Sequence, residues 1–116
     1  MQKGASVNMV FYSIEDFYEK AENCLRMTRQ EEIACAIKMR AGDTAAREQL
    51  IKSYIPMVAS HIKRMQRDQQ TLGLAVYCMQ ALEKAVDSFD FLQESETFTH
   101  RLSWWLRQGT TEYIVR

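Results

Sequence analysis

The chain has 116 residues, of which 47% are hydrophobic, so it supports one globular domain and excludes the composition of a disordered protein. Four Gly and one Pro are too few turn formers for a sandwich or barrel of many short strands, and we therefore expect an all-α fold of about five helices in one bundle. The 15 basic and 15 acidic side chains balance to zero net charge, which excludes a domain that holds nucleic acid mainly by neutralising phosphates and leaves room only for local DNA binding.

The first part of the chain predicts two helices with recognisable starts. Apolar residues recur at three- and four-residue spacing over residues 11–25, and Ser13 can cap this first helix. Thr28 and Glu31 have the spacing of a capping box at the start of a second helix. Gly42 supplies the stop of that helix, because glycine readily adopts the left-handed backbone at a helix C-terminus.

The middle of the chain continues this pattern up to its single proline. Asp43 can cap a third helix over residues 44–55, where Pro56 interrupts the apolar spacing. Because proline is tolerated in the first turn of a helix but not in its interior, Pro56 either kinks this helix or opens the next one. Residues 57–65 continue an apolar stripe beside a dense basic cluster, and the polar run 66–71 marks a loop.

The last part predicts two longer helices. Residues 72–89 are apolar at helical spacing, and their length favours a buried central helix over a strand. The acidic segment 92–97 is a connection, and residues 98–114 trace a last helix with large groups on two sides. No repeat or long linker divides the chain, so residues 1–116 are expected to form a single domain, with a first helix inside residues 1–26.

The sequence lacks the motifs of an enzyme, so no catalytic residue and no cofactor is expected. His61 and His100 are isolated, and such histidines are usually structural or solvated. Five carboxylates near the predicted connection could form an acidic metal site, but residues at this spacing more often form a solvated face, and no metal is expected. They are Glu83, Asp87, Asp90, Glu94 and Glu96.

Two further observations concern the compartment. The three cysteines are far apart and include no Cys-x-x-Cys pair, so ordinary reduced thiols are expected rather than a disulfide framework or a zinc site. No segment approaches the ~20 apolar residues that span a bilayer, and the N-terminal residues lack the apolar core and cleavage site of a signal peptide. The sequence therefore predicts a cytoplasmic protein with no membrane partner.

The adjacent pair Trp104 and Trp105 is the first signal of a function. Neighbouring residues of a helix point about 100° apart, so one indole can enter the core while the other projects outward. The alternative is that both indoles are core or partly buried packing groups, because aromatic side chains are common in cores. Trp104, Gln108 and Thr111 follow the spacing i, i+4 and i+7 with Arg107 beside them, and a stacking plane beside an arginine suits single-stranded bases.

Two sequence segments resemble region 2 of bacterial RNA polymerase sigma factors of the primary class. Residues 81–90 read A-L-E-K-A-V-D-S-F-D, and residues 98–111 read F-T-H-R-L-S-W-W-L-R-Q-G-T-T. The family pattern is approximately G-L-x-K-A-V-D-x-F-D, a short loop, and then F-S-T-Y-A-x-W-W-I-R-Q-A-I-T. Residues 27–62 look like regions 1.2 and 2.1 of the same family, so the resemblance extends over residues 27–116.

This resemblance implies a helical domain that docks on the clamp of core RNA polymerase and captures flipped non-template bases of the promoter minus-ten element. Trp104 matches the indole that supports the flipped adenine, and Trp105 its neighbour at the upstream fork. Gln108 and Thr111 match the pair that reads the upstream edge of the element, and Arg107 matches a cation that contacts the DNA backbone. The implied DNA-binding residues are Phe98, whose aromatic ring largely supports packing, His100, Arg101, Trp104, Trp105, Arg107, Gln108 and Thr111.

The chain departs from the family pattern in two places. Arg101 replaces the tyrosine that stacks on the flipped adenine, although a guanidinium plane can itself stack or hold a phosphate. The family's clamp-binding motif D-L-I-Q-E-G falls on G-L-A-V-Y-C at residues 73–78, so the expected surface is apolar, presented by Val76, Tyr77 and Met79, unless the helix turns to bury them. The implied polymerase-binding residues are Leu72, Val76, Tyr77, Met79, Gln80 and Glu83.

Three hypotheses for function follow. The first is a sigma region 2-like transcription initiation protein that acts either alone, as half of a split factor, or with a separate chain that supplies region 4, because no region 4-like sequence follows residue 111 before the last residue, Arg116. The second is a degenerate sigma-like regulator that binds polymerase or another sigma factor without reading DNA, which Arg101 and an apolar docking surface favour. The third is a helical scaffold or homodimer.

Overall fold

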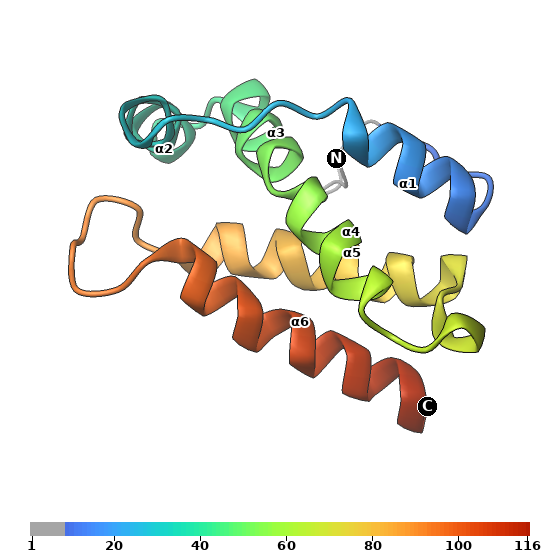
Figure 1. Cartoon of the computed structure of the whole chain (residues 1–116). Helices are drawn as coiled ribbons and strands as arrows, with labels where there is room; N and C mark the ends of the chain where they lie inside the picture. The colour runs from blue at the N-terminus through green and yellow to red at the C-terminus, as the bar shows by residue number, and fades with distance from the viewer. Residues whose placement is uncertain (1–8) are drawn as a thin grey trace.

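The computed structural model describes residues 9–116, which form six α helices and one short 3-10 turn (Figure 1). This range contains no strand, so the predicted all-α fold is confirmed. Within the same range, no helix is long and apolar enough to cross a membrane. Residues 1–8, on which the absence of a signal peptide was judged, lie outside the described part of the chain.

The first two helices begin at the predicted capping residues. Ser13 precedes α1 (Ile14–Glu22), and its hydroxyl accepts a hydrogen bond from the backbone N–H of Asp16 at 3.0 Å. Thr28 precedes α2 (Arg29–Arg40) and shares both hydrogen bonds of a capping box with Glu31, at 3.1 and 2.8 Å. Gly42 follows α2 with φ of 99°, a backbone conformation that costs glycine little. The predicted first helix is too long, because α1 ends before residues 23–25.

The proline separates two short helices. Asp43 caps α3 (Thr44–Ser53) through its carboxylate, and Pro56 lies in the first turn of α4 (Ile55–Lys63). Pro56 therefore opens the next helix, which was one of the two predicted possibilities. Tyr54 ends α3 and starts α4 with φ of −108°, and this break gives the bundle one helix more than about five.

The two longest helices carry the rest of the architecture. The 3-10 turn η1 (Arg67–Gln69) leads into α5 (Leu72–Ser88), and α6 (Phe98–Val115) runs beside α5 (Figure 1). Gly109 lets α5 and α6 approach closely, since a Cβ atom there would lie 3.2 Å from both the Tyr77 carbonyl oxygen and the Ala81 Cβ. One side of α6 therefore packs closely on α5, and residues on its other side are exposed to solvent.

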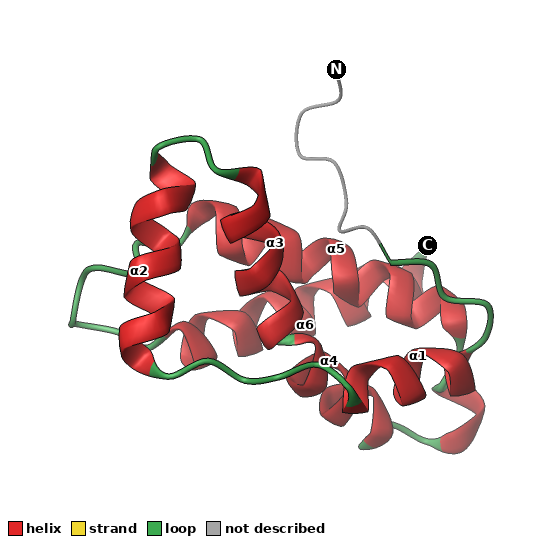
Figure 2. Ribbon diagram, turned by 90° about the horizontal axis from the view of Figure 1, so that it is seen from above, coloured by secondary structure: helices red, strands yellow, loops and turns green. Residues whose placement is uncertain are grey.

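The remaining helices cover α5 from the side away from α6 (Figures 1 and 2). The pair α2 and α3 packs together at one end, while α1 and α4 pack together and against α5 at the other end. The predicted central helix is therefore α5, and the core consists of the apolar faces that surround it. Its largest fully buried side chains are Phe17, Phe91, Leu50, Ile51, Ile55, Ile62, Leu74, Leu82, Leu102 and Leu106.

Candidate nucleic-acid interface

One stripe of α6 faces solvent. Trp104 is 44% exposed, and Arg107, Gln108 and Thr111 are exposed on the same stripe, as their spacing predicts. The Thr111 hydroxyl donates to the Arg107 carbonyl at 2.9 Å, which leaves the hydroxyl oxygen free to accept a further hydrogen bond. The stripe thus offers an aromatic face, a cation, an amide and a hydroxyl along one helix surface.

The two tryptophans occupy different environments. Trp105 is partly buried against the core, and its ring meets that of Trp104 edge to face, with centroids 5.1 Å apart and an interplanar angle of 88°. This contact fixes the exposed indole of Trp104 through its neighbour. Trp104 is thus not a core residue, although its contact with Trp105 also gives it a packing role.

Phe98 anchors the start of α6 and offers no surface to DNA. Its side chain is 4% exposed, and its ring centroid lies 4.7 Å from that of Tyr54 and 4.8 Å from that of Phe91. It therefore supports the packing of α6, as the resemblance implies, and its buried ring leaves little surface for a contact with DNA. His100, two residues on, is exposed in the first turn of α6.

Arg101 forms an ion pair at the rim of a surface groove. Its Nη2 lies 2.9 Å from Oε1 of Glu96, which precedes the N-cap of α6. The groove has a volume of about 490 Å³ and lies between the end of α5, the connection and the first turns of α6, with Phe89 and Trp105 in its lining. Sequence reasoning missed the pairing of Glu96 with Arg101, although a charge at five-residue separation across a helix start was visible.

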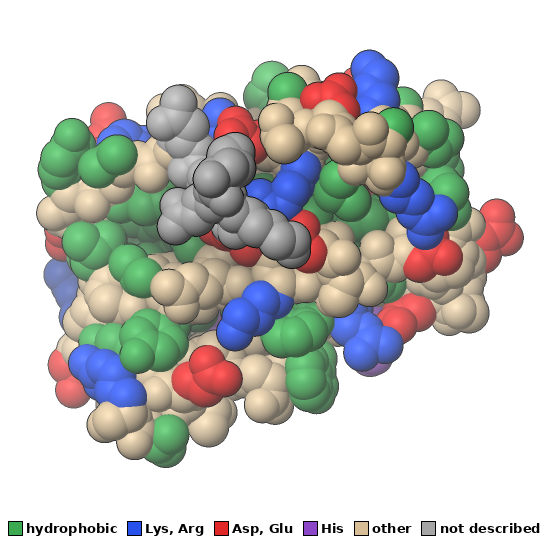
Figure 3. All heavy atoms as spheres, turned by 180° about the vertical axis from the view of Figure 1, so that it is seen from behind, with side chains coloured by type: hydrophobic (Ala, Val, Ile, Leu, Met, Phe, Trp, Pro, Cys, Tyr) green, Lys and Arg blue, Asp and Glu red, His purple; other side chains and the backbone are tan. Residues whose placement is uncertain are grey.

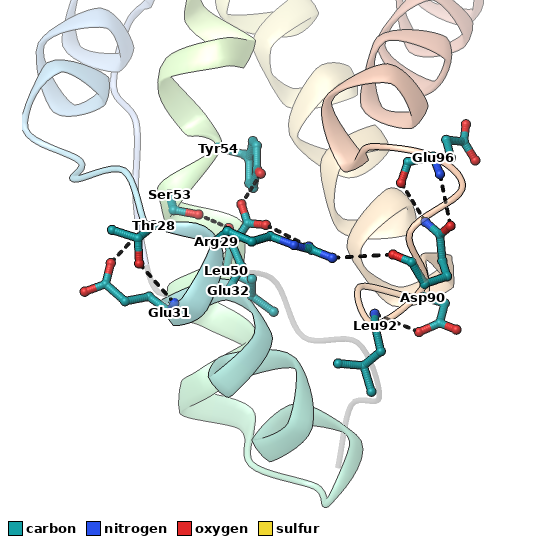
Figure 4. A network of polar contacts seen from close by, with 11 residues as sticks. Thr28, Arg29, Glu31, Glu32, Leu50, Ser53, Tyr54, Asp90, Leu92 and Glu96 are labelled. Carbon is teal, nitrogen blue, oxygen red and sulfur yellow. Dashed lines mark hydrogen bonds and ion pairs between the residues drawn. The ribbon is translucent and has the colours of Figure 1, made fainter.

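Gln93 holds the connection in shape. Its side-chain oxygen accepts hydrogen bonds from the backbone N–H groups of Ser95 at 2.7 Å and Glu96 at 3.0 Å. Its side-chain nitrogen donates to the Glu96 carbonyl at 2.7 Å, and Arg29 of α2 donates to the Gln93 carbonyl at 3.4 Å (Figure 4). Glu96 is therefore positioned by a hydrogen-bonded loop.

A buried carboxylate joins α2 to the junction of α3 and α4 (Figure 4). The Tyr54 hydroxyl donates a short hydrogen bond to Oε2 of Glu32, which is 8% exposed, and Arg29 lies 3.6 Å from the other oxygen. Burial and the hydrogen bond to Glu32 raise the pKa of Tyr54. No sequence pattern singled out Glu32, because nothing in the helix period marks a carboxylate that a tyrosine from another helix will cover.

His61 links α4 to α6 beside the exposed stripe. Its Nε2 lies 2.9 Å from the Thr110 hydroxyl oxygen, so this histidine has the structural role that isolated histidines usually have. Burial, and then the positive charges of Arg64 and Arg107, lower the pKa of His61 below its ordinary value of 6.5. The imidazole is therefore neutral at neutral pH, and two cations lie near it.

The acidic residues of α5 and the connection pair with arginines. Arg47 binds Asp87 through Nε at 2.7 Å and lies 3.5 Å from Glu83, and Arg40 binds Asp90. Within residues 9–116, no three His, Cys, Asp or Glu side chains are grouped to hold a metal ion. These ion pairs thus fasten α5 to α3, and the connection after α5 to α2.

The predicted polymerase-binding residues differ in their exposure. Val76 is 45% exposed, and Gln80 is exposed near it. Met79 is only 7% exposed, so its expected place on an apolar surface is wrong, because it faces the core. The ring of Tyr77 packs against Tyr113, with centroids 5.3 Å apart. The two remaining members are partly buried: Leu72, which packs against the core, and Glu83, which faces Arg47.

Comparison with known proteins finds relatives that include bacterial RNA polymerase sigma factors. Over 90 residues, the chain is 36% identical to RNA polymerase sigma factor SigA of Listeria monocytogenes and of Listeria innocua, and 34% identical to that of Clostridium acetobutylicum. Each match covers 77% of this chain, whereas the chain spans about a quarter of each relative, 24%. No protein-family model and no solved structure matches the chain. Over these 90 residues the chain is therefore similar to a segment of the sigma factor SigA.

Proposed function

We propose that this chain is a sigma factor-like transcription initiation protein that docks on core RNA polymerase and binds the single-stranded non-template strand of the promoter minus-ten element. The observation that carries the proposal is the exposed stripe of α6, where Trp104 is 44% exposed beside Arg107, Gln108 and Thr111. Stacking on an aromatic ring beside a cation is how proteins hold single-stranded bases.

The near-neutral charge of α6 indicates that tight DNA binding depends on core polymerase. Residues 98–116 hold three arginines, Arg101, Arg107 and Arg116, against the single acid Glu112, and Arg101 is already paired with Glu96. Basic and acidic side chains are also interspersed on the face opposite to Figure 1 (Figure 3). Because phosphate neutralisation supplies most of the affinity for DNA, the isolated chain is expected to bind weakly and the polymerase-bound chain tightly.

The decisive experiment is fluorescence anisotropy of a fork-junction promoter DNA with an unpaired minus-ten strand, at one fixed salt concentration, with and without core polymerase. We expect binding that depends on polymerase and that Trp104→Ala weakens about tenfold, since base stacking is worth roughly 1–3 kcal/mol. Tyr12→Ala is the matched control, because Tyr12 is an aromatic residue of 78% exposure outside α6. Absence of DNA binding under both conditions would rule out the proposal.

One observation favours a second candidate, a sigma-like regulator that binds polymerase or another sigma factor without reading DNA. Arg101 is engaged with Glu96 at 2.9 Å, at the position where the family pattern has its base-stacking tyrosine. A pull-down that returns polymerase subunits or a sigma factor, together with no DNA binding in the anisotropy experiment, would establish this candidate. A pull-down that returns neither would dismiss it.

A further inference from the structure

The groove beside Arg101 combines aromatic faces with a pre-arranged ion pair. Phe89 and Trp105 contribute partly buried rings, and Arg101 and Glu96 contribute opposite charges at the same rim. The volume of about 490 Å³ exceeds the size of one nucleobase. The groove therefore has both elements that a base needs, a stacking surface and an edge of hydrogen-bonding groups.

The ion pair leaves hydrogen-bonding capacity unused. Only Nη2 of Arg101 and Oε1 of Glu96 take part in it, at 2.9 Å. Within residues 9–116, no partner is found for Oε2 of Glu96 or for Nη1 of Arg101. The side chain of Glu96 is 27% exposed and its backbone is fixed by Gln93, so a donor and two acceptor oxygens stand together in a held position.

We infer that this groove binds a guanine base, with Arg101 and Glu96 reading the base edge. Guanine presents O6 as an acceptor, followed by the N1–H and N2–H donors, along one edge. Arg101 would donate to O6, and Glu96 would accept from N1–H and N2–H, without separation of the ion pair. Arginine can equally bind O6 and N7 of guanine with two hydrogen bonds, which is the commonest specific contact of arginine with a base.

The other bases fit this edge less well. Adenine has one donor and one acceptor in reach, and thymine places its second carbonyl oxygen against the carboxylate of Glu96. Cytosine can form three hydrogen bonds in the opposite orientation, but its single ring covers less of Phe89 and Trp105. Purine stacking together with three hydrogen bonds thus favours guanine.

The guanine can belong to a DNA strand or to a free nucleotide, and the position of the groove favours the strand. Arg101, Trp104, Gln108 and Thr111 follow one another at three- and four-residue spacing along α6. The groove thus lies at one end of the exposed stripe, where a strand that stacks on Trp104 would arrive next. This assignment of the strand as the source rests on the proposed function, whereas the guanine chemistry of the groove does not.

The test compares thymidine octamers that carry G, A, C or T at one central position, and adds free GMP as a separate ligand. Binding to the whole chain is followed by fluorescence anisotropy and by the NMR signal of the Trp105 indole N–H. The Trp104→Phe variant, which retains only this indole, assigns the signal to Trp105. We expect the guanine octamer to bind about tenfold more tightly than the adenine and thymine octamers. Glu96→Gln should reduce this preference to less than twofold, because an NH2 donor replaces one of the two carboxylate oxygens that face the N1–H and N2–H donors of guanine.

Two variants separate specificity from general effects. Glu94→Gln is the matched control, since Glu94 is an exposed acid of the same connection outside the groove lining, and it should keep the preference. Arg107→Gln should weaken all four octamers by the same factor, because it removes a phosphate contact and no base contact. Circular dichroism of each variant establishes that the helices remain folded.

Each outcome decides the inference. Guanine preference that Glu96→Gln removes supports a strand-borne guanine. GMP binding without octamer binding supports a free nucleotide and overturns the strand as the source, while the proposed function is decided by the anisotropy experiment with core polymerase. Equal binding of the four octamers, or cytosine or adenine as tight as guanine, overturns the guanine site and leaves DNA binding intact. If neither GMP nor any octamer shifts the Trp105 signal, the guanine site is overturned.

Discussion

Arginines at two seams of the bundle are arranged differently. Arg47, at the seam of α3 and α5, is 13% exposed and binds Asp87 with two nitrogens, at 2.7 and 2.9 Å, while Glu83 lies 3.5 Å away. Arg107, at the seam of α4 and α6, has no carboxylate partner within residues 9–116, and it lies with Arg64 near His61. The charge of Arg47 thus stabilises the fold, whereas the charge of Arg107 is available to a ligand.

The largest expected effect on stability comes from removing the ion pairs of Arg47 between α3 and α5. Arg47→Met should lower the free energy of unfolding by about 2 kcal/mol, because Asp87 loses a bidentate partner and Glu83, whose side chain is 14% exposed, loses a nearby cation. Urea denaturation followed by circular dichroism measures this. Arg40→Met is the matched control, since Arg40 and Asp90 form an exposed pair, at 53% and 52%, and such pairs contribute little. Equal losses for both variants would contradict the distinction between the seams.

A smaller effect is expected from the pH dependence of the second seam. The pKa of His61 is lowered in the folded chain, so the unfolded chain binds more protons as the pH falls through 6.5. The contribution of His61 to stability is thus present above pH 6.5 and is lost as the pH falls toward the lowered folded pKa. The free energy of unfolding of the wild type minus that of His61→Gln should therefore decrease below pH 6.5, by a fraction of the Arg47 effect.

The groups that face His61 define the control for this titration. They are Arg64 of its own helix and Arg107 and Thr110 of α6. The Thr110 hydroxyl oxygen also lies 3.8 Å from the Cys78 sulfur of α5. No carboxylate is among the causes of the pKa shift, so nothing in this surrounding favours the protonated imidazole. Arg107→Ala should weaken the pH dependence, and a difference curve that rises on acidification would contradict the sign.

The helix starts were predictable from sequence because capping is local. Ser13, Thr28 and Asp43 each satisfy backbone N–H groups within three residues, so the signal lies inside a short window. The side of α5 that Met79 faces was not predictable in the same way. Both sides of α5 carry apolar residues, and the packing of α1, α3, α4 and α6 against them decides which ones are covered.

The exposed stripe of the candidate site was predictable, whereas its groove was not. Trp104 and Gln108 share a helix face through the 3.6-residue period alone. The pairing of Arg101 with Glu96 depends on how Gln93 folds the connection, and the approach of Phe89 depends on the angle between α5 and α6. Such contacts come from tertiary structure, for which a single sequence gives no period.

The smallest expected effect on stability is that of replacing Arg107. This replacement tests most directly whether Arg107, unlike Arg47, serves a ligand rather than the fold. Because Arg107 has no ion pair to lose, Arg107→Ala should change the free energy of unfolding by less than about 0.5 kcal/mol. The same variant should lower the salt dependence of DNA binding by about one unit of slope, because one phosphate contact disappears. Anisotropy titrations of the fork-junction DNA with core polymerase at several salt concentrations give this slope. An unchanged slope would mean that Arg107 contacts no phosphate and that its charge serves the fold instead.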